Sequence, residues 1–440
     1  MSANLLTRLG QCLREAREEI GLMRISGAIT EVSPAYARVA GLSPFLKLGD
    51  CVSLGETQLA EVVRIDPETA TIKPFDDRIQ IQLGQRAYYA GNLRIFPTHS
   101  WKGRVVNALG KAVDDDGLLE RGATAFRLEA SPPPAMRRQR ISKPIKSGIR
   151  AIDLFTPICA GQRIGIFAGS GVGKSTLLAM LANSRDFDTV VVALVGERGR
   201  EVREFIDEAL AVNRSSTVTV VTTSDESPVM RRLAPKTAMT IAEYFRSQGQ
   251  SVLLIIDSIT RFAHAARDVA MASGELPVAR GYTPSVFGDL PKLLERAGPG
   301  EEGQGTITGV FSVLVDGDDV NDPVADTIRG ILDGHIVLDR TIAEQGRYPA
   351  INVLRSISRL APSAWTIEQN DLVARLRALI ARYEDTGDLR LMGGYRQGGD
   401  AELDQAIAIV PKIYAALCQS PRSGPSTDAF RELTEFLQTA

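Results

Sequence analysis

The sequence is poor in the residues that build metal clusters and disulfide frameworks. Its 440 residues include three histidines and four cysteines, and the cysteines are scattered with no CxxC pair. We therefore expect neither a zinc site nor a disulfide scaffold, and this cysteine usage is typical of a reducing cytoplasm. We interpret His99, His264 and His335 as ordinary surface or packing residues.

Long apolar runs and an excess of charge are also missing. No stretch approaches the roughly 18 apolar residues of a membrane-spanning helix, and the N-terminus lacks the apolar core of a signal peptide. The 51 lysines and arginines nearly balance 53 aspartates and glutamates, so the net charge of −2 gives no general attraction to nucleic acid or anionic lipid. The composition predicts a soluble, cytoplasmic protein with roughly two to four domains.

The first hundred residues contain two different patterns. Apolar residues recur at helical spacing within 1–22, which predicts an amphipathic helix that either folds back on its own core or docks on a partner. Residues 23–98 contain short runs such as "VSLGET", "EVVRID" and "ATIKPF" between turn residues, which predicts a β-barrel. The basic, proline-rich stretch 131–150 has no aromatic residue for base stacking, so we interpret it as a solvated connector.

The middle of the chain alternates apolar runs with helical patterns. "RIGIFA", "TVVVALVG", "TVTVVTT" and "SVLLIID" are interleaved with predicted helices at 174–184, 199–211 and 228–248. Strands that are apolar along their whole length predict a parallel sheet covered on both faces. Helical patterns at 366–384, 401–418 and 427–439 follow. We therefore predict a multi-domain α/β protein: an N-terminal β-barrel (23–98), a parallel-sheet core (99–360) and a C-terminal helical domain (361–440).

The segment "FAGSGVGKST" lies between a predicted strand and a predicted helix, and glycines at alternate positions let its backbone N–H groups turn toward an anion. This is the arrangement of a phosphate-binding P-loop, in which Lys174 contacts the β- and γ-phosphates and the Ser175 hydroxyl binds Mg²⁺. Ala168 replaces the first glycine of the strict pattern, and we expect so small a residue to be tolerated. The predicted ATP-binding residues of the loop are Gly169, Ser170, Gly171, Val172, Gly173, Lys174, Ser175 and Thr176.

Two carboxylates follow buried strands of the predicted sheet. Asp257 ends "SVLLIID", where it would hold the Mg²⁺ shell through water, although many such residues only cap a helix. Glu197, with Arg198 beside it, ends "TVVVALVGER" and is our candidate for orienting the attacking water. From the spacing alone, a surface ion pair explains Glu197 as well as a catalytic role does.

Five ordered motifs carry a family resemblance: "AGSGVGKS", "GERGREV", "LLIIDSITRFA", "GYTPSVFGDLPKLLERAG" and "ILDGHIVLDR". From about residue 23 to 415 the chain resembles the catalytic subunits of rotary ATP synthases and the related hexameric ATPases of bacterial protein export. The resemblance implies a RecA-like P-loop ATPase core in which Glu197 is the catalytic carboxylate and Arg198 accompanies it. It also implies that Tyr348 packs on adenine and that Arg359 reaches the phosphates of a neighbouring subunit.

Within that superfamily, "TTSDESPVMRRLA" and "FSVLVDGDDVNDPVAD" look most like the flagellum-specific export ATPases. The resemblance implies a homohexameric Mg-ATP hydrolase at the inner face of the cytoplasmic membrane that energises flagellar protein export. Its partners would be a regulatory protein on the N-terminal helix, a rotor-like stalk, a membrane export gate, and export substrates with their chaperones, but no nucleic acid. The alternatives are an ATPase of a virulence injectisome, a catalytic synthase subunit, and a ring-shaped RNA translocase.

Overall fold

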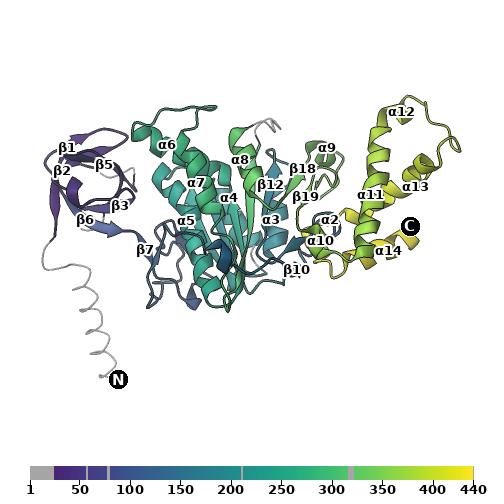
Figure 1. The fold of residues 1–440 in the computed structure, drawn as a ribbon, viewed down its shortest axis with the longest axis horizontal. Coiled ribbons are helices and arrows are strands. Elements are labelled where there is room, and N and C mark those ends of the chain that lie inside the picture. The colour runs from purple at the N-terminus through teal and green to yellow at the C-terminus, as the bar shows by residue number, and fades with distance from the viewer. Residues whose placement is uncertain (1–23, 56–57, 77–79, 210–211, 316–321, 440) are drawn as a thin grey trace, which may run out of the picture. The chain divides into compact units, whose positions relative to one another are not determined.

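The computed structural model describes residues 24–439 except 56–57, 77–79, 210–211 and 316–321 (Figure 1). The predicted amphipathic helix at 1–22 lies outside these described residues. The chain divides into two compact units: one contains the residues up to 93 with 227–230 and 268–276, and the other contains the rest.

A closed antiparallel barrel forms the first unit. Its strands follow one another around the barrel in the order β1-β2-β5-β4-β3-β6. Apolar side chains at alternate positions, such as Ile29, Val52 and Ile72, are fully buried in its interior, because successive side chains of a strand point to opposite faces. The predicted barrel is confirmed. The strands are β1 (Ser26–Val32), β2 (Ala37–Ala40), β3 (Asp50–Leu54), β4 (Gln58–Ile65), β5 (Thr69–Pro74) and β6 (Arg86–Asn92).

A nine-stranded sheet organises the second unit. Its order is β19-β18-β12-β17-β15-β13-β14-β8, with β16 paired to β17, and all pairs are parallel except those of β16 and β19. Every residue of β13 is buried, so both faces of the sheet are covered, as predicted. The strands are β8 (Val105–Asn107), β12 (Arg163–Ala168), β13 (Thr189–Glu197), β14 (Thr217–Thr223), β15 (Ser251–Asp257), β16 (Gly298–Pro299), β17 (Thr306–Leu314), β18 (Gly334–Leu338) and β19 (Ile357–Ser358).

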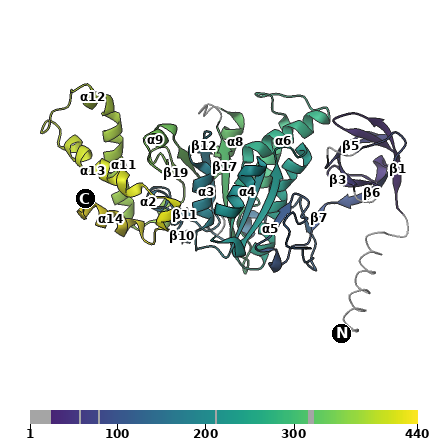
Figure 2. The same ribbon diagram turned by 180° about the vertical axis from the view of Figure 1, so that it is seen from behind.

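Helices flank this sheet in both views of the ribbon (Figures 1 and 2). The residues of α3 and α4 that face the sheet pack on alternate residues of β12, β13 and β15 in one hydrophobic cluster. The helices are α2 (Arg150–Phe155), α3 (Lys174–Ala182), α4 (Gly199–Glu204), α5 (Pro228–Ser247), α6 (Ile259–Ala272), α7 (Pro284–Leu294), α8 (Pro323–Ile331), α9 (Arg340–Glu344) and α10 (Ala361–Ala364). Two short strand pairs, β7 (Arg94–Ile95) with β9 (Phe126–Arg127) and β10 (Pro144–Ile145) with β11 (Ile158–Cys159), complete the unit.

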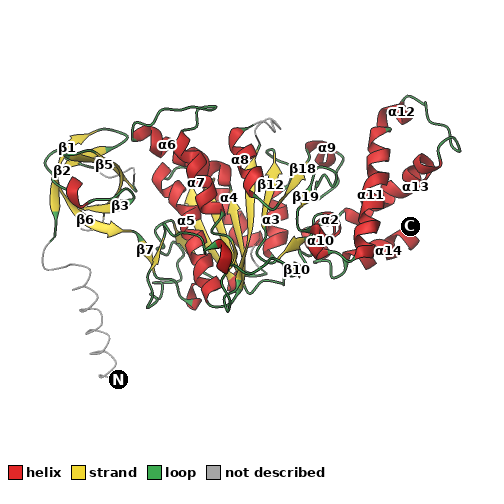
Figure 3. Cartoon of the chain, in the orientation of Figure 1, coloured by secondary structure: helices red, strands yellow, loops and turns green. Residues whose placement is uncertain are grey.

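The last part of the second unit is helical (Figure 3). A capping box at Thr366 begins α11 (Ile367–Asp385), and the Asp400 side chain caps α13 (Ala401–Leu417). The short α12 (Gly387–Leu391) lies between them in the chain, and α14 (Ala429–Thr439) ends the fold. Buried residues of α11 and α13 join the same hydrophobic cluster as α3. None of the helices within the described ranges is long and apolar enough to cross a membrane.

Candidate nucleotide site

The P-loop connects the end of β12 to the start of α3. Gly171 and Gly173 have φ angles of +80° and +92°, a left-handed backbone that favours glycine. Gly173 is the N-cap of α3 and no side chain caps the helix there, so the N–H groups of its first turn have no side-chain acceptor. Such a helix start, with the positive end of its dipole, suits an anion of the size of a phosphate.

Lys174 and Asp257 meet in front of this loop. The Lys174 ammonium forms an ion pair with the Asp257 carboxylate, and Ser312 Oγ donates a hydrogen bond of 2.6 Å to Asp257 Oδ1. Asp257 is 3% exposed. Because β17 lies between β12 and β15, Ser312 is placed beside both the P-loop strand and the strand that ends in Asp257.

Glu197 lies at the same carboxyl edge of the sheet. It is 8% exposed, and its Oε2 lies 3.1 Å from Nη2 of Arg261. Arg261 also donates from Nη1 to the carbonyl of Gly196, so one guanidinium holds both the carboxylate and its preceding backbone. Burial, together with the charge of Asp257, raises the pKa of Glu197 to about 7, against the opposing charges of Lys174 and Arg261. This carboxylate can therefore accept a proton near neutral pH.

A cavity of about 570 Å³ opens beside the P-loop and is lined by Ser175, Thr176, Glu197 and Asp257. Within the described ranges, no group of three or more His, Cys, Asp or Glu side chains could hold a metal ion by itself. Magnesium in nucleotide sites needs less, because phosphate oxygens and water supply most of its ligands. The Ser175 hydroxyl and the Asp257 carboxylate at the cavity wall fit that requirement.

Tyr348 lies beside the P-loop, in the segment between α9 and β19. Its side chain is 45% exposed, and a Cβ atom added to Gly173 would lie 3.3 Å from Cε1 of its ring. The ring therefore flanks the loop at the start of α3, and Gly173 leaves it the room to do so.

Arg359 lies at the amino edge of the sheet, where β12 and β18 begin, opposite the carboxyl edge that carries the P-loop. Its backbone N–H donates to the carbonyl of Asp333 at 2.9 Å, and its neighbour Ser358 pairs with Gly334, the first residue of β18. Gly334 pairs with Ile164 near the start of β12, whereas the P-loop follows the end of that strand. The six residues of β12 span roughly 20 Å, too far for Arg359 to reach its own P-loop.

Arg198 does not share the cavity wall with Glu197. Its side chain is 81% exposed and its Nη1 lies 3.8 Å from Oε1 of Glu201. The structure thus brings together Lys174, Ser175, Glu197, Asp257 and Tyr348, while Arg198 and Arg359 stand away from the cavity.

Two family descriptions match consecutive parts of the chain. Residues 148–358 match the nucleotide-binding domain of the ATP synthase alpha/beta family, and residues 365–435 match the C-terminal domain of the type III secretion ATPase EscN. The flagellum-specific ATP synthase of Rhizobium meliloti (strain 1021) is 56% identical over 417 residues, which is 94% of this chain and 89% of that relative. The chain belongs to the ATP synthase alpha/beta family. Within it, the chain is an ATPase of the flagellar and type III secretion branch.

Other relatives of this ATPase come from both kinds of export system. The SPI-2 type 3 secretion system ATPase of Salmonella typhimurium is 46% identical over 372 residues, 84% of this chain and 85% of the relative. The assembled ATPase EscN of enteropathogenic E. coli superimposes with a TM-score of 0.87 at 41% identity, covering 93% of this chain and all of EscN. EscN has also been solved in complex with its central stalk EscO. The fold predicted from the sequence is confirmed.

Two residues of the ATPase site were missed from the sequence. Arg261 is four positions after Asp257, in the first turn of α6, and it lies within the motif "LLIIDSITRFA". A basic residue one helical turn after the strand's final aspartate was therefore a usable signal. Ser312 lies inside an apolar strand and becomes visible only through the pairing of β17 with β15.

Proposed function

We propose that this ATPase hydrolyses Mg-ATP to energise the export and release of flagellar proteins at a type III export gate. The observation that carries the proposal is the pairing of Lys174 with the buried Asp257, close to the buried Glu197, in front of the P-loop. The names of its relatives support the flagellar role, since the matching proteins from Rhizobium, Agrobacterium and Caulobacter are all called flagellum-specific ATP synthases.

Nucleotide binding would rearrange the ion pair. The N–H groups at the start of α3 would hold the phosphates with Lys174, which would turn from Asp257 toward the β- and γ-oxygens. Asp257, retained by Ser312, would then face the metal shell together with the Ser175 hydroxyl. Magnesium, when bound, neutralises phosphate charge in the transition state.

Glu197 would orient and polarise the water that attacks the terminal phosphate. Its raised pKa suits a group that takes up proton density near neutral pH, and the contact with Arg261 holds the carboxylate in place. Tyr348, beside Gly173, would pack on the adenine ring.

Arg359 would act on the site of a neighbouring subunit. Its place at the far edge of the sheet supports this role, because a guanidinium that cannot reach its own P-loop is available to another one. A homohexameric ring would present it there, and the assembled form of EscN is consistent with such a ring. Arginines supplied in this way stabilise the transferring phosphoryl group by about 10³- to 10⁵-fold in rate.

The remaining partners follow from the same proposal. A stalk protein would bind the ring, since assembled EscN was solved in complex with its central stalk EscO. Export substrates with their chaperones would meet the ring at the membrane export gate. The helix expected at 1–22 would bind a regulatory partner, and the protein would work in the cytoplasm at the inner membrane face. The division into domains at residues 23, 99 and 361 belongs to this proposal as well.

Hydrolysis is tested by Glu197→Gln in the purified protein. We expect the rate of ATP hydrolysis to fall by about 10²- to 10⁴-fold while binding of a labelled nucleotide is retained. Glu204→Gln is the matched control, because Glu204 lines the same cavity but is half-exposed and pairs with Arg200. Equal turnover of the Glu197 variant and the control would remove Glu197 from the proposed role.

The export role is tested in cells that carry Glu197→Gln at the chromosomal locus. We expect loss of flagellar filaments and of secreted flagellar proteins, with growth by oxidative phosphorylation unchanged. Loss of virulence-type secretion with intact flagella would instead support the injectisome alternative, and co-purification with synthase subunits would support a catalytic synthase subunit.

A further inference from the structure

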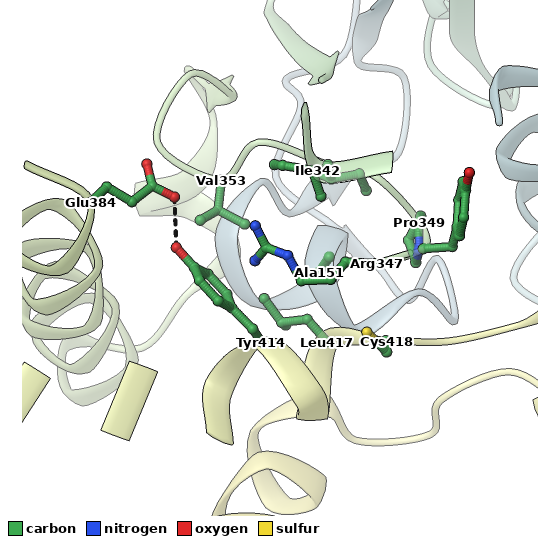
Figure 4. Close-up of a pocket in the computed structure, with 11 residues that line it drawn as sticks. Ala151, Ile342, Arg347, Pro349, Val353, Glu384, Tyr414, Leu417 and Cys418 are labelled. Carbon is green, nitrogen blue, oxygen red and sulfur yellow. Dashed lines mark hydrogen bonds between the residues drawn. The ribbon is translucent and has the colours of Figure 1, made fainter. Parts of the chain in front are cut away.

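The segment that carries Tyr348 is fastened to the C-terminal helices by its preceding residue. The Arg347 guanidinium lies over the ring of Tyr414 at 3.9 Å from the ring centre. The Tyr414 hydroxyl in turn donates to Oε1 of Glu384 at 2.6 Å (Figure 4). Tyr414 belongs to α13 and Glu384 to α11, so Arg347 contacts one of these helices and is linked through Tyr414 to the other.

The backbone of Tyr348 is held by Gln419, which lies two residues after the end of α13. Gln419 donates its backbone N–H to the carbonyl of Tyr348 at 2.8 Å. Gln419 is itself 5% exposed, and both polar atoms of its side-chain amide are hydrogen-bonded. Its Nε2 donates to the Gly148 carbonyl at 2.8 Å, and its Oε1 accepts from the Arg150 N–H at 3.1 Å. Tyr414 in α13 and Gln419 just after it therefore contact two successive residues, Arg347 and Tyr348.

The space between these groups is a narrow, mostly apolar seam. Its cavity measures about 20 Å³, room for about one water molecule, and apolar side chains such as Ile342, Val353 and Leu417 line it. Burial, reinforced by Glu384, raises the pKa of Tyr414, so the hydroxyl remains a donor at any physiological pH.

We propose that Arg347, Tyr414 and Glu384 are positioning residues for the nucleotide base, forming a clamp through which the packing of α11 and α13 sets the place of Tyr348. The Tyr348 ring is nearly half exposed, so its direction depends on its backbone rather than on packing around the ring. Movement of α13 relative to the sheet would shift Arg347 and Gln419 together, and with them the surface that meets adenine. This inference rests on the proposed contact between Tyr348 and the base.

The test compares two ligands that share phosphates but differ in having a base. In Arg347→Ala, we expect the Kd for Mg-ATP to rise about five- to tenfold, the range of a partly buried cation–π contact, while the Kd for inorganic Mg-tripolyphosphate is unchanged. The rate at saturating ATP should stay the same. Tyr414→Phe keeps the ring but loses the bond to Glu384, so its ATP affinity should fall about twofold.

Arg121→Ala is the matched control, because Arg121 lies over the ring of Phe96 at 3.9 Å, the same distance as Arg347 over Tyr414, in a different part of the unit. Arg390 is unsuitable, because the tyrosine ring beneath it packs against Tyr414. Arg121→Ala should change neither Kd. Equal effects of Arg347→Ala and Arg121→Ala, or an equal loss of affinity for both ligands in Arg347→Ala, would overturn the clamp.

A second variant separates this inference from the proposed function. Tyr348→Ala should weaken Mg-ATP binding, and adding Arg347→Ala to it should cause no further loss, because the clamp acts through Tyr348. If Tyr348→Ala leaves ATP affinity unchanged, the proposed base contact itself is wrong. If it weakens binding but the two substitutions are additive, only the clamp is overturned.

Discussion

The two edges of the central sheet use charge in different ways. At the amino edge, Arg163 lies 3.1 Å from Asp333 and 2.5 Å from Glu295, so each carboxylate has a cation beside it. At the carboxyl edge, Asp257 and Glu197 are both buried, and Lys174 serves Asp257 while Glu197 shares Arg261 with a backbone carbonyl. The pKa of Glu197 rises there to about 7. The two edges differ in burial: the carboxylates of the amino edge are partly exposed, whereas those of the carboxyl edge are buried close to each other, a setting typical of functional sites.

Arg359 also lies at the amino edge, but it lacks the ion pairs that Arg163 forms there. Its substitution should have the largest effect on turnover. No carboxylate in the described part of the chain forms an ion pair with it. We expect Arg359→Ala to lower the turnover of the assembled enzyme by about 10³-fold or more. Mixing Arg359→Ala with Lys174→Ala should restore activity, because some interfaces then combine an intact arginine with an intact P-loop.

Arg355→Ala is the control for that experiment, since Arg355 is also exposed and its nearest carboxylate, Asp339, lies 3.8 Å away. A mixture no more active than its components would place Arg359 outside any neighbouring site and make the two edges functionally independent.

At the carboxyl edge, ionised Glu197 should lower the free energy of unfolding at alkaline pH. Glu197 has an ordinary pKa of 4.5 that the fold raises to about 7, so the folded state binds its proton more tightly and loses that stabilisation as the pH rises through 7. Glu197→Gln should therefore be more stable than the wild type at pH 8.5, by up to about 3 kcal/mol in the free energy of unfolding. Denaturant unfolding measures the difference, which should shrink toward zero as the pH falls to about 4.5.

At the amino edge, by contrast, removing a charge should lower the free energy of unfolding. Arg163→Met leaves Asp333 without its cation and removes the nearer of the two arginines beside Glu295, the other being Arg138. We expect the free energy of unfolding at pH 7.5 to fall by about 2 kcal/mol, less than for a fully buried pair because both carboxylates are partly exposed. ATP turnover measured well below the unfolding temperature should be unchanged. A variant that keeps its stability but loses turnover would show that this edge also takes part in catalysis.

The smallest expected effect is a shift in the pH dependence of hydrolysis. Glu197 acts in its ionised form, so kcat/KM should fall about tenfold per unit as the pH drops below about 7. Arg261→Gln removes a positive charge that lowers this pKa, so the acid limb should move to higher pH. Arg198→Gln, altering a side chain that is 81% exposed, should leave the limb in place. A limb unmoved in both variants would separate Arg261 from the ionisation of Glu197.

Local patterns were enough to predict much of this protein. The glycines of "FAGSGVGKST" placed the P-loop, because only glycine adopts the positive φ angles of Gly171 and Gly173 easily. Runs rich in apolar and β-branched residues predicted β12, β13, β14 and β15, and helical periodicity predicted α11, α13 and α14. Asp257 and Glu197 followed from one rule, that parallel strands end at the same edge.

Sequence alone determined the P-loop, the buried strands and the helix starts, since these depend on neighbours along the chain, and it predicted most of the candidate site residues but not Arg261 or Ser312. Only the tertiary structure decided which of them meet: it paired Lys174 with Asp257, gave Glu197 the guanidinium of Arg261 rather than that of Arg198, and put Arg359 at the far edge. These outcomes depend on the order and register of strands far apart in sequence. No local pattern records that order, because pairing is set by the packing of the whole sheet.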